Sequence, residues 1–271
     1  AEGSTIHLSA STTDAIDTCP LRWFLEREAG AGTSSGLSAS VGSIVHAIAK
    51  DLGDRILDPD VSPPDLPEMI EHLDSVWNRL THDSPWQELR ERERAEAMLK
   101  RLDEWQKANS RDLIAAEHEV KVTFHPDDDS VILIGAMDRI ERDPNTGELC
   151  IVDIKTGKTA PTQKSMGEHV QLGFYQVAIE RGALGETSAQ ASAELVFVAK
   201  EKGTKEPEMP KVLTKAQLGE ESPAREQMER AISVIRSEKH EATPCDACEY
   251  CSFANVCPTK TIHTVGADEN E

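Results

Sequence analysis

The chain has no long apolar run and no leader-like opening, and each absence narrows what it can be. None of its apolar stretches approaches the ~18 residues that a membrane span requires, so we expect no membrane partner or anchor. The opening Ala-Glu-Gly-Ser-Thr has neither a basic nor an apolar segment, so no secretory signal is visible and we expect a cytoplasmic protein. The first residue is Ala1 rather than methionine, which suggests a fragment cut from a longer protein.

Positive charge is also scarce. The 29 lysines and arginines face 49 acidic residues, for a net charge of -20. Phosphate binding normally leaves a basic footprint, so this balance argues against general nucleic-acid affinity. Residues 155–215 are an exception, with nine basic and seven acidic residues. A nucleic-acid enzyme with this composition would need bound metal ions to reverse the sign at its reaction centre, or a partner to deliver the strand.

Six cysteines are present, and we expect them to be reduced. A chain of 271 residues can bury a sizeable core as one domain, 1–271, and has no need of disulfides. Residues 245–258 form a cysteine cluster segment with the pattern Cys248-x2-Cys251-x5-Cys257, and Cys19 lies far upstream. Thiolates without a paired histidine suit an iron-sulfur cluster or zinc. Cys245 offers a wholly local alternative to Cys19, whereas Cys150 is interpreted as a buried apolar residue.

Hydrophobic periodicity predicts an α/β fold with a helical insertion. We expect helices from Ser9 or Ser11 to Glu28, over 41–52, 165–181 and 222–239, a helical subdomain over 58–110, and strands over 116–124, 131–141, 149–155 and 193–200. The segments 127–129 and 143–147 are typical of hairpin turns, so the first three strands should form a largely antiparallel meander that enters a mixed sheet. The first helix would carry Cys19, and the tail 266–271 should be disordered.

Two carboxylates leave adjacent strands of this meander. Asp153 and Lys155 share one face of an otherwise apolar strand, because side chains alternate with a period of two. The side chain of Asp138 projects from the preceding strand in the same way, and a hairpin between the two strands can bring it close to Asp153. Two carboxylates repel unless a divalent cation lies between them. Mg²⁺ or Mn²⁺ beside a lysine is what phosphodiester hydrolysis requires. A buried Asp-Lys ion pair is the structural alternative, and an isolated His46 is more often a structural hydrogen-bonding residue.

Four segments, in this order, resemble the RecB-type branch of the PD-(D/E)xK nuclease superfamily. They are Gly42-Ser-Ile-Val-His46, Gly135-Ala-Met-Asp138-Arg-Ile140, Ile151-Val-Asp153-Ile-Lys155-Thr-Gly157 and Gln171-Leu-Gly-Phe-Tyr175. The resemblance covers nearly the whole chain except about 58–110. Met137 stands where the superfamily name has proline, a residue that this branch commonly lacks. The resemblance implies a restriction-endonuclease-like core, with a mixed central sheet flanked by helices.

The same resemblance implies roles for individual residues. It implies that His46, Asp138, Asp153 and the carbonyl of Ile154 bind Mg²⁺ or Mn²⁺, that Lys155 is catalytic, and that Gln171 and Tyr175 contact DNA or support the site. The last two are four residues apart and therefore share one helix face. Glu119 in the first strand is a further candidate carboxylate.

The N-terminal segments Ser9-Ala-Ser11 and Cys19-Pro-Leu-Arg-Trp23, with the C-terminal cysteines, resemble the iron-sulfur subgroup that includes AddB and the CRISPR-associated single-strand exonucleases. In that subgroup Cys19, Cys248, Cys251 and Cys257 would hold a 4Fe-4S cluster, which here would staple the C-terminus to the N-terminal helix. The acidic, alanine-rich character is most similar to the C-terminal nuclease domain of actinobacterial AdnAB-type helicase-nucleases.

These patterns lead to one functional expectation and two rivals. We expect a metal-dependent DNA nuclease, a single-strand exonuclease or endonuclease, that acts in double-strand-break end processing and recombinational repair. A helicase domain or subunit would supply its strand. The rivals are a noncatalytic iron-sulfur module that binds DNA ends or serves as a scaffold, and a free-standing RecB-family exonuclease.

Overall fold

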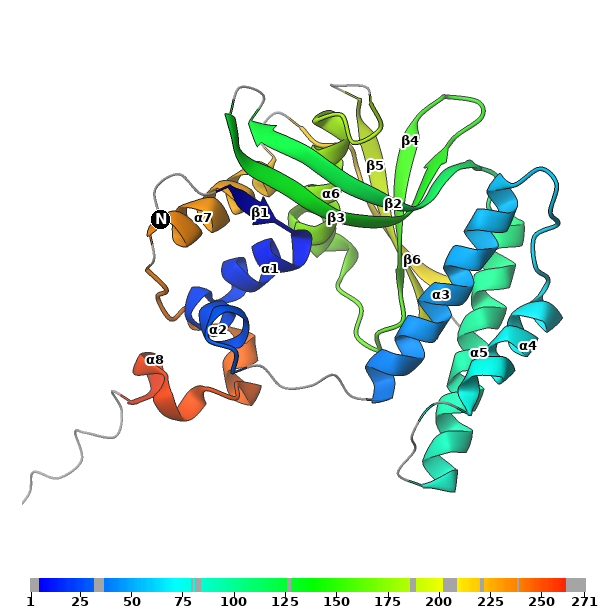
Figure 1. Cartoon of the computed structure of the whole chain (residues 1–271), viewed down its shortest axis with the longest axis horizontal. Helices are drawn as coiled ribbons and strands as arrows, with labels where there is room; N and C mark the ends of the chain where they lie inside the picture. The colour runs from blue at the N-terminus through cyan, green and yellow to red at the C-terminus, as the bar shows by residue number, and fades with distance from the viewer. Residues whose placement is uncertain are drawn as a thin grey trace, which may run out of the picture.

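A mixed sheet of six strands lies at the centre of the computed structural model (Figure 1), which describes residues 5–31, 37–78, 80, 84–125, 128–185, 189–201, 209–219, 222–237 and 239–261. The strands are β1 (Ile6–Leu8), β2 (Asp112–His125), β3 (Asp128–Arg142), β4 (Leu149–Lys155), β5 (Ala191–Glu201) and β6 (Pro210–Lys215). They are ordered β1-β3-β4-β5-β6, and β2 pairs with β3 outside this path.

The helical elements include short 3-10 and π segments. They are α1 (Ala10–Thr18), α2 (Pro20–Trp23), η1 (Phe24–Glu28), α3 (Leu37–Leu57), α4 (Leu66–Trp77), α5 (Pro85–Ala108), η2 (Gln163–Glu168), α6 (Val170–Glu180), α7 (Pro223–Ser237), η3 (Asp246–Tyr250), η4 (Ala254–Val256) and α8 (Pro258–Thr261). Within the described residues, no helix is both long and apolar enough to cross a membrane.

The strand pairing confirms the expected meander. β2, β3 and β4 pair antiparallel in succession, and the turn between β3 and β4 closes with the amide of Gly147 donating to the carbonyl of Asp143 at 2.8 Å. β4 then pairs parallel with β5, and β1 parallel with β3, so the sheet is mixed. In the other expected turn, 127–129, residue 127 lies outside the described part of the chain, and residues 128 and 129 already belong to β3.

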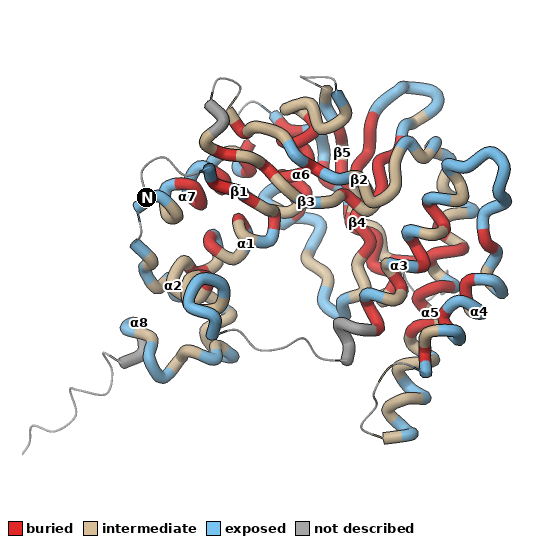
Figure 2. Tube along the Cα trace, viewed as in Figure 1, coloured by how far each residue is buried: buried red, intermediate tan, exposed pale blue. Residues whose placement is uncertain are grey.

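Helices cover both faces of the sheet and produce two apolar cores (Figures 1 and 2). One core packs the sheet against α1, α6 and α7, and the other packs it against α3, α4 and α5. β4 serves both, because Leu149 and Ile151 belong to the first core while Cys150, Val152 and Ile154 belong to the second. Cys150 is 3% exposed, so its expected burial is confirmed.

The long first helix expected from the sequence is wrong. α1 is capped by Ser9, whose hydroxyl accepts from the amide of Thr12 at 3.2 Å, but the helix stops at Thr18. Cys19 is extended, with φ -164° and ψ 106°, because the ring of Pro20 disfavours helical geometry in the residue before it. Cys19 therefore lies in the break between α1 and α2 instead of on a helix.

Other boundaries differ for similar local reasons. The helix expected over 165–181 is interrupted at His169, whose ring Nδ1 accepts from the amide of Leu172 and caps α6. The sequence reading missed β1, which has three residues, and β6, which begins at Pro210. The stretch at 58–110 contains two helices, α4 and α5, which begin at Leu66 and end at Ala108. The tail 266–271 lies outside the described residues.

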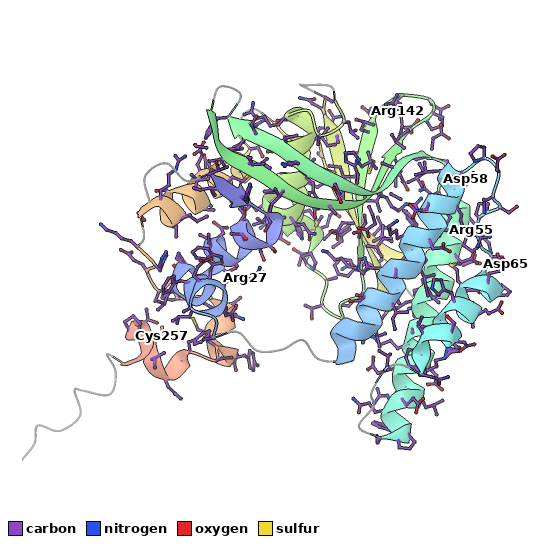
Figure 3. The ribbon with its side chains drawn as sticks, viewed as in Figure 1. Arg27, Arg55, Asp58, Asp65, Arg142 and Cys257 are labelled. Carbon is purple, nitrogen blue, oxygen red and sulfur yellow. The ribbon has the colours of Figure 1, made fainter. Side chains whose placement is uncertain are left out.

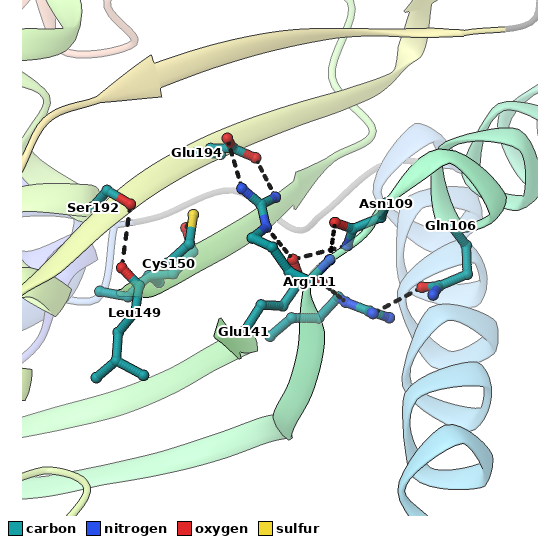
Figure 4. A network of polar contacts seen from close by, with 10 residues as sticks. Gln106, Asn109, Arg111, Glu141, Leu149, Cys150, Ser192 and Glu194 are labelled. Carbon is teal, nitrogen blue, oxygen red and sulfur yellow. Dashed lines mark hydrogen bonds and ion pairs between the residues drawn. The ribbon is translucent and has the colours of Figure 1, made fainter. Parts of the chain in front are cut away.

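A buried ionic network joins the end of α5 to the sheet (Figure 4). Arg111 donates from Nε to Glu141 at 2.9 Å and from both terminal nitrogens to Glu194 at 3.0 and 2.7 Å. Glu141 is 0% exposed and also accepts from Arg139 at 3.0 Å, which is itself 1% exposed. Two carboxylates thus balance two guanidinium groups, and Glu141 contacts both of them.

Glu141→Ala should therefore destabilise the fold by about 3–5 kcal/mol, because it leaves the buried guanidinium of Arg139 without its carboxylate. Arg230→Met is the control, since its pair with Asp17 is more than half exposed on the arginine side and should be worth about 1 kcal/mol or less. Urea unfolding of both variants measures the difference. Equal losses in the two variants would show that the network anchors nothing.

Candidate functional site

Acidic side chains gather where the hydrogen-bonded ladder between β3 and β4 ends. Arg139 and Val152 form the last pair at this end of the antiparallel ladder. Asp138, one residue before Arg139, and Asp153, one residue after Val152, lie just beyond that pair. Beyond the ladder, the amide of Ile154 donates to Oδ2 of Asp138 at 2.7 Å. This bond fixes the Asp138 carboxylate against β4 and beside Asp153.

Three potential metal ligands meet at this point. One ligand atom each from His46 of α3, Glu117 of β2 and Asp138 of β3 lie within 4.8 Å of one another, and they form the single such set of three among the described residues. Nδ1 of His46 is 3.6 Å from Oδ2 of Asp138. Carboxylate oxygens suit Mg²⁺ and Mn²⁺, and an imidazole nitrogen is compatible with Mn²⁺ and other transition metals, so the donor set fits a divalent cation.

The carboxylate contributed by β2 is Glu117 rather than Glu119, whose side chain is exposed. Glu117 has φ 45°, the only positive value among the described non-glycine residues. Such strained conformations persist where the surroundings enforce them, and they cluster at functional sites. Strand alternation assigns residues 117 and 119 to the same face, so the sequence offered no signal for choosing between them.

Asp153 belongs to a second, contiguous group with Lys155. The carboxylate of Asp153 is 3% exposed by residue, lies 2.7 Å from Nζ of Lys155, and accepts from Nε2 of Gln171 at 2.7 Å. Lys155 also donates to Oε1 of Gln171 at 2.5 Å, and Nε2 of Gln171 lies 3.5 Å from the hydroxyl of Tyr175. The one-face placement expected for Gln171 and Tyr175 is therefore observed, and Gln171 connects α6 to both charged residues of β4.

Burial sets the charge state of the site. It raises the pKa of Asp138 to about 7, with further contributions from the charges of Asp153 and Glu117, against the lowering effect of the Ile154 amide and Lys155. Burial also raises the pKa of Asp153, while Lys155 opposes that shift. Burial lowers the pKa of His46, so its imidazole is neutral and free to act as a ligand at neutral pH. The carboxylates are thus poorly stabilised as anions without an additional cation.

Two cavities flank the acidic residues. One, of about 470 Å³, is lined by Gly42, Ser43, His46, Ala47, Lys50, Glu117 and Thr156. The other, of about 370 Å³, is lined on the side of α1 and α6 by residues that include Ser9, Ser11, Asp14, Lys155 and Tyr175. His46 and Glu117 of the metal-ligand group line the first cavity, and Lys155 lines the second. An extended ligand in contact with both would therefore cross the acidic centre.

Five of the six cysteines line a separate small cavity between the two ends of the chain. They are Cys19, Cys245, Cys248, Cys251 and Cys257. Figures 1 and 3 show the C-terminal segment, with Cys257 labelled, beside α2. The amide of Leu21 donates to the carbonyl of Glu241 at 3.1 Å, so the two ends are also joined by backbone contact.

The comparison with known families agrees with this geometry. The model of the PD-(D/E)XK nuclease superfamily matches residues 7–258, nearly the whole chain. No curated protein matches the chain.

The raised pKa of Asp138 predicts a specific pH dependence for the metal-free protein. Between pH 3.8 and about 7 the folded state keeps a proton that the unfolded state has released, so the free energy of unfolding should fall as the pH rises through this window. This contribution is fully present below pH 3.8 and is lost above about 7. Urea unfolding with EDTA across this range should give a shallower pH dependence for Asp138→Asn. If the free energy of unfolding depended on pH equally in the wild type and in Asp138→Asn, the raised pKa would not belong to Asp138.

Proposed function

The chain belongs to the PD-(D/E)XK nuclease superfamily, and we propose that it is a metal-dependent deoxyribonuclease. The observation that carries this proposal is the set of three ligand atoms from His46, Glu117 and Asp138 within 4.8 Å, next to the Asp153-Lys155 pair. A structural ion pair alone would not explain why a strained glutamate and a neutral histidine converge on the same carboxylate.

Each residue of the site has a proposed role. When bound, Mg²⁺ or Mn²⁺ activates water and stabilises charge on the phosphate. His46, Glu117 and Asp138 would hold the ion, with Asp153 and the carbonyl of Ile154 as further ligands. The amide of Ile154 keeps Asp138 in place.

Lys155 supplies a cation for the negative charge that develops on the phosphate. Asp153 and Gln171 orient its Nζ at 2.7 and 2.5 Å. Tyr175 borders the same cavity as Lys155 and would contact the DNA or support Gln171.

We further propose that the substrate is a single strand. Cavities on both sides of the acidic centre suit an extended strand that passes through it. The net charge of -20 gives the chain little attraction for DNA of its own, which favours delivery by a helicase domain or subunit. This arrangement corresponds to end processing in recombinational repair by an AdnAB-type helicase-nuclease of the RecB/AddB class. A free-standing exonuclease would instead cleave efficiently without a motor.

The cysteine cavity is proposed to hold a 4Fe-4S cluster. Five cysteine side chains line it, and thiolates without a paired histidine suit an iron-sulfur cluster or zinc. The sulfurs of Cys245 and Cys248 lie 3.9 Å apart. Resemblance favours Cys19, Cys248, Cys251 and Cys257 as the four ligands, with Cys245 as the alternative to Cys19.

Removing one metal ligand should abolish cleavage. Glu117→Gln and Asp153→Ala should each lower kcat by at least about 100-fold, because the cation supplies several kcal/mol of transition-state stabilisation. Lys155→Ala should do nearly the same while Mn²⁺ still binds. Glu119→Gln is the matched control on the same strand and should keep wild-type activity. Digestion of labelled single-stranded DNA with Mn²⁺ measures all four. Wild-type cleavage by Asp153→Ala would disprove the site.

The cluster should be visible and should stabilise the fold. Protein purified anaerobically should be brown, with a broad absorption near ~400 nm from thiolate-to-iron charge transfer. Cys19→Ala should bleach this band and lower the melting temperature, whereas Cys245→Ala and Cys150→Ala should keep the colour. Colourless wild-type protein with one zinc would contradict the cluster. Bleaching in the Cys245 variant alone would replace the staple between the chain ends with a local C-terminal site.

A further inference from the structure

The segment that follows Lys155 leaves the sheet and needs other partners. Lys155 and Phe197 are the last paired residues of β4 and β5, so the carbonyl of Thr156 has no place in that ladder. Buried backbone carbonyls are nearly always hydrogen-bonded. Here the donor is Nη2 of Arg94, on α5 of the helical insertion, at 2.8 Å. The contact joins two segments that are 62 positions apart in the chain.

The side chain of Thr156 packs against the opposite helix, α3. A Cβ added at Gly42 would lie 2.7 Å from Oγ1 of Thr156, closer than real Cβ contacts, so any larger residue there would force the Thr156 side chain to shift. Gly42 is four residues before His46 and therefore about one helical turn away on the same side of α3. Thr156 is thus held between the helix that carries His46 and the helix that carries Arg94.

We infer that Arg94 is a positioning residue for the proposed nuclease reaction. By holding the carbonyl of Thr156, it fixes the end of β4 against α3 and so sets the separation between Lys155 and His46. This inference rests on the proposed function. Arg94 is absent from the described linings of both cavities at the acidic centre, so it acts through Thr156 and not on the substrate.

The geometry suits a rigid link. The Arg94 side chain is one-fifth exposed, and its Nη1 is held by Oε2 of Glu91 at 3.1 Å on the same helix, so the guanidinium is oriented before it meets Thr156. Reacting groups tolerate little displacement, and an error of about 1 Å can cost roughly 100-fold in rate. Releasing one side of Thr156 should therefore affect turnover more than the affinity for DNA.

Arg94→Met tests the link, with Arg101→Met as the matched control. Arg101 lies on the same helix and also donates to a strand carbonyl at 2.8 Å, but to Val198 of β5. Arg94→Met should lower kcat about tenfold or more with a nearly unchanged KM for single-stranded DNA, and should raise the Mn²⁺ concentration for half-maximal binding. Arg94→Lys should recover much of the loss, and Arg101→Met should match the wild type in both measurements.

Melting temperatures separate positioning from general destabilisation. If Arg94→Met and Arg101→Met lost turnover in parallel with stability, or if Arg94→Met kept wild-type kcat and Mn²⁺ binding, the inference would be overturned. If Arg94→Met does not fold, Arg94→Lys decides the question, because its altered donor at the Thr156 carbonyl should still lower kcat and Mn²⁺ affinity relative to Arg101→Met. Wild-type protein that binds Mn²⁺ but does not cleave would contradict the proposed function, while Mn²⁺ affinity of the Arg94 variant would still decide its positioning role.

Discussion

The hydrogen bond from the amide of Ile154 to Asp138 is the contact on which the site depends. It replaces a ladder bond at the point where β3 and β4 separate, and it holds one buried carboxylate beside another. Burial raises the pKa of both, and the charge of Asp153 adds to the shift at Asp138. A low-dielectric site with two such groups needs a cation, and the neutral imidazole of His46 and the strained Glu117 complete a set of donors for it.

The sheet brings together residues from both of its faces. Asp153, Lys155 and Gln171 lie on the side of α1 and α6, whereas His46 comes from α3 on the other side. The helical insertion contributes to this arrangement, because α5 is anchored to the sheet through the Arg111 network and reaches Thr156 through Arg94. Packing of the second core and geometry of the acidic centre are therefore linked.

Sequence reasoning recovered what depends on local periodicity. β4 alternates between two cores, and this explains why Asp153 and Lys155 could be assigned to one face and its bounds predicted at 149–155. Short or edge elements such as β1 carry too few residues for a pattern. Pro20 accounts for the break at Cys19, but the apolar spacing on both sides of it favoured one continuous helix. Glu117 could not be chosen over Glu119, because strand alternation places both on one face and gives no sign of the positive φ at Glu117.

The most direct test is digestion of single-stranded DNA labelled at the 5′ or the 3′ end, with Mn²⁺ or Mg²⁺ and with EDTA. The wild-type domain should release label as short fragments only when the metal is present, and the two labels together would give the polarity. DNA that is bound but remains intact in Mn²⁺ would contradict a nuclease and favour a noncatalytic module that binds DNA ends.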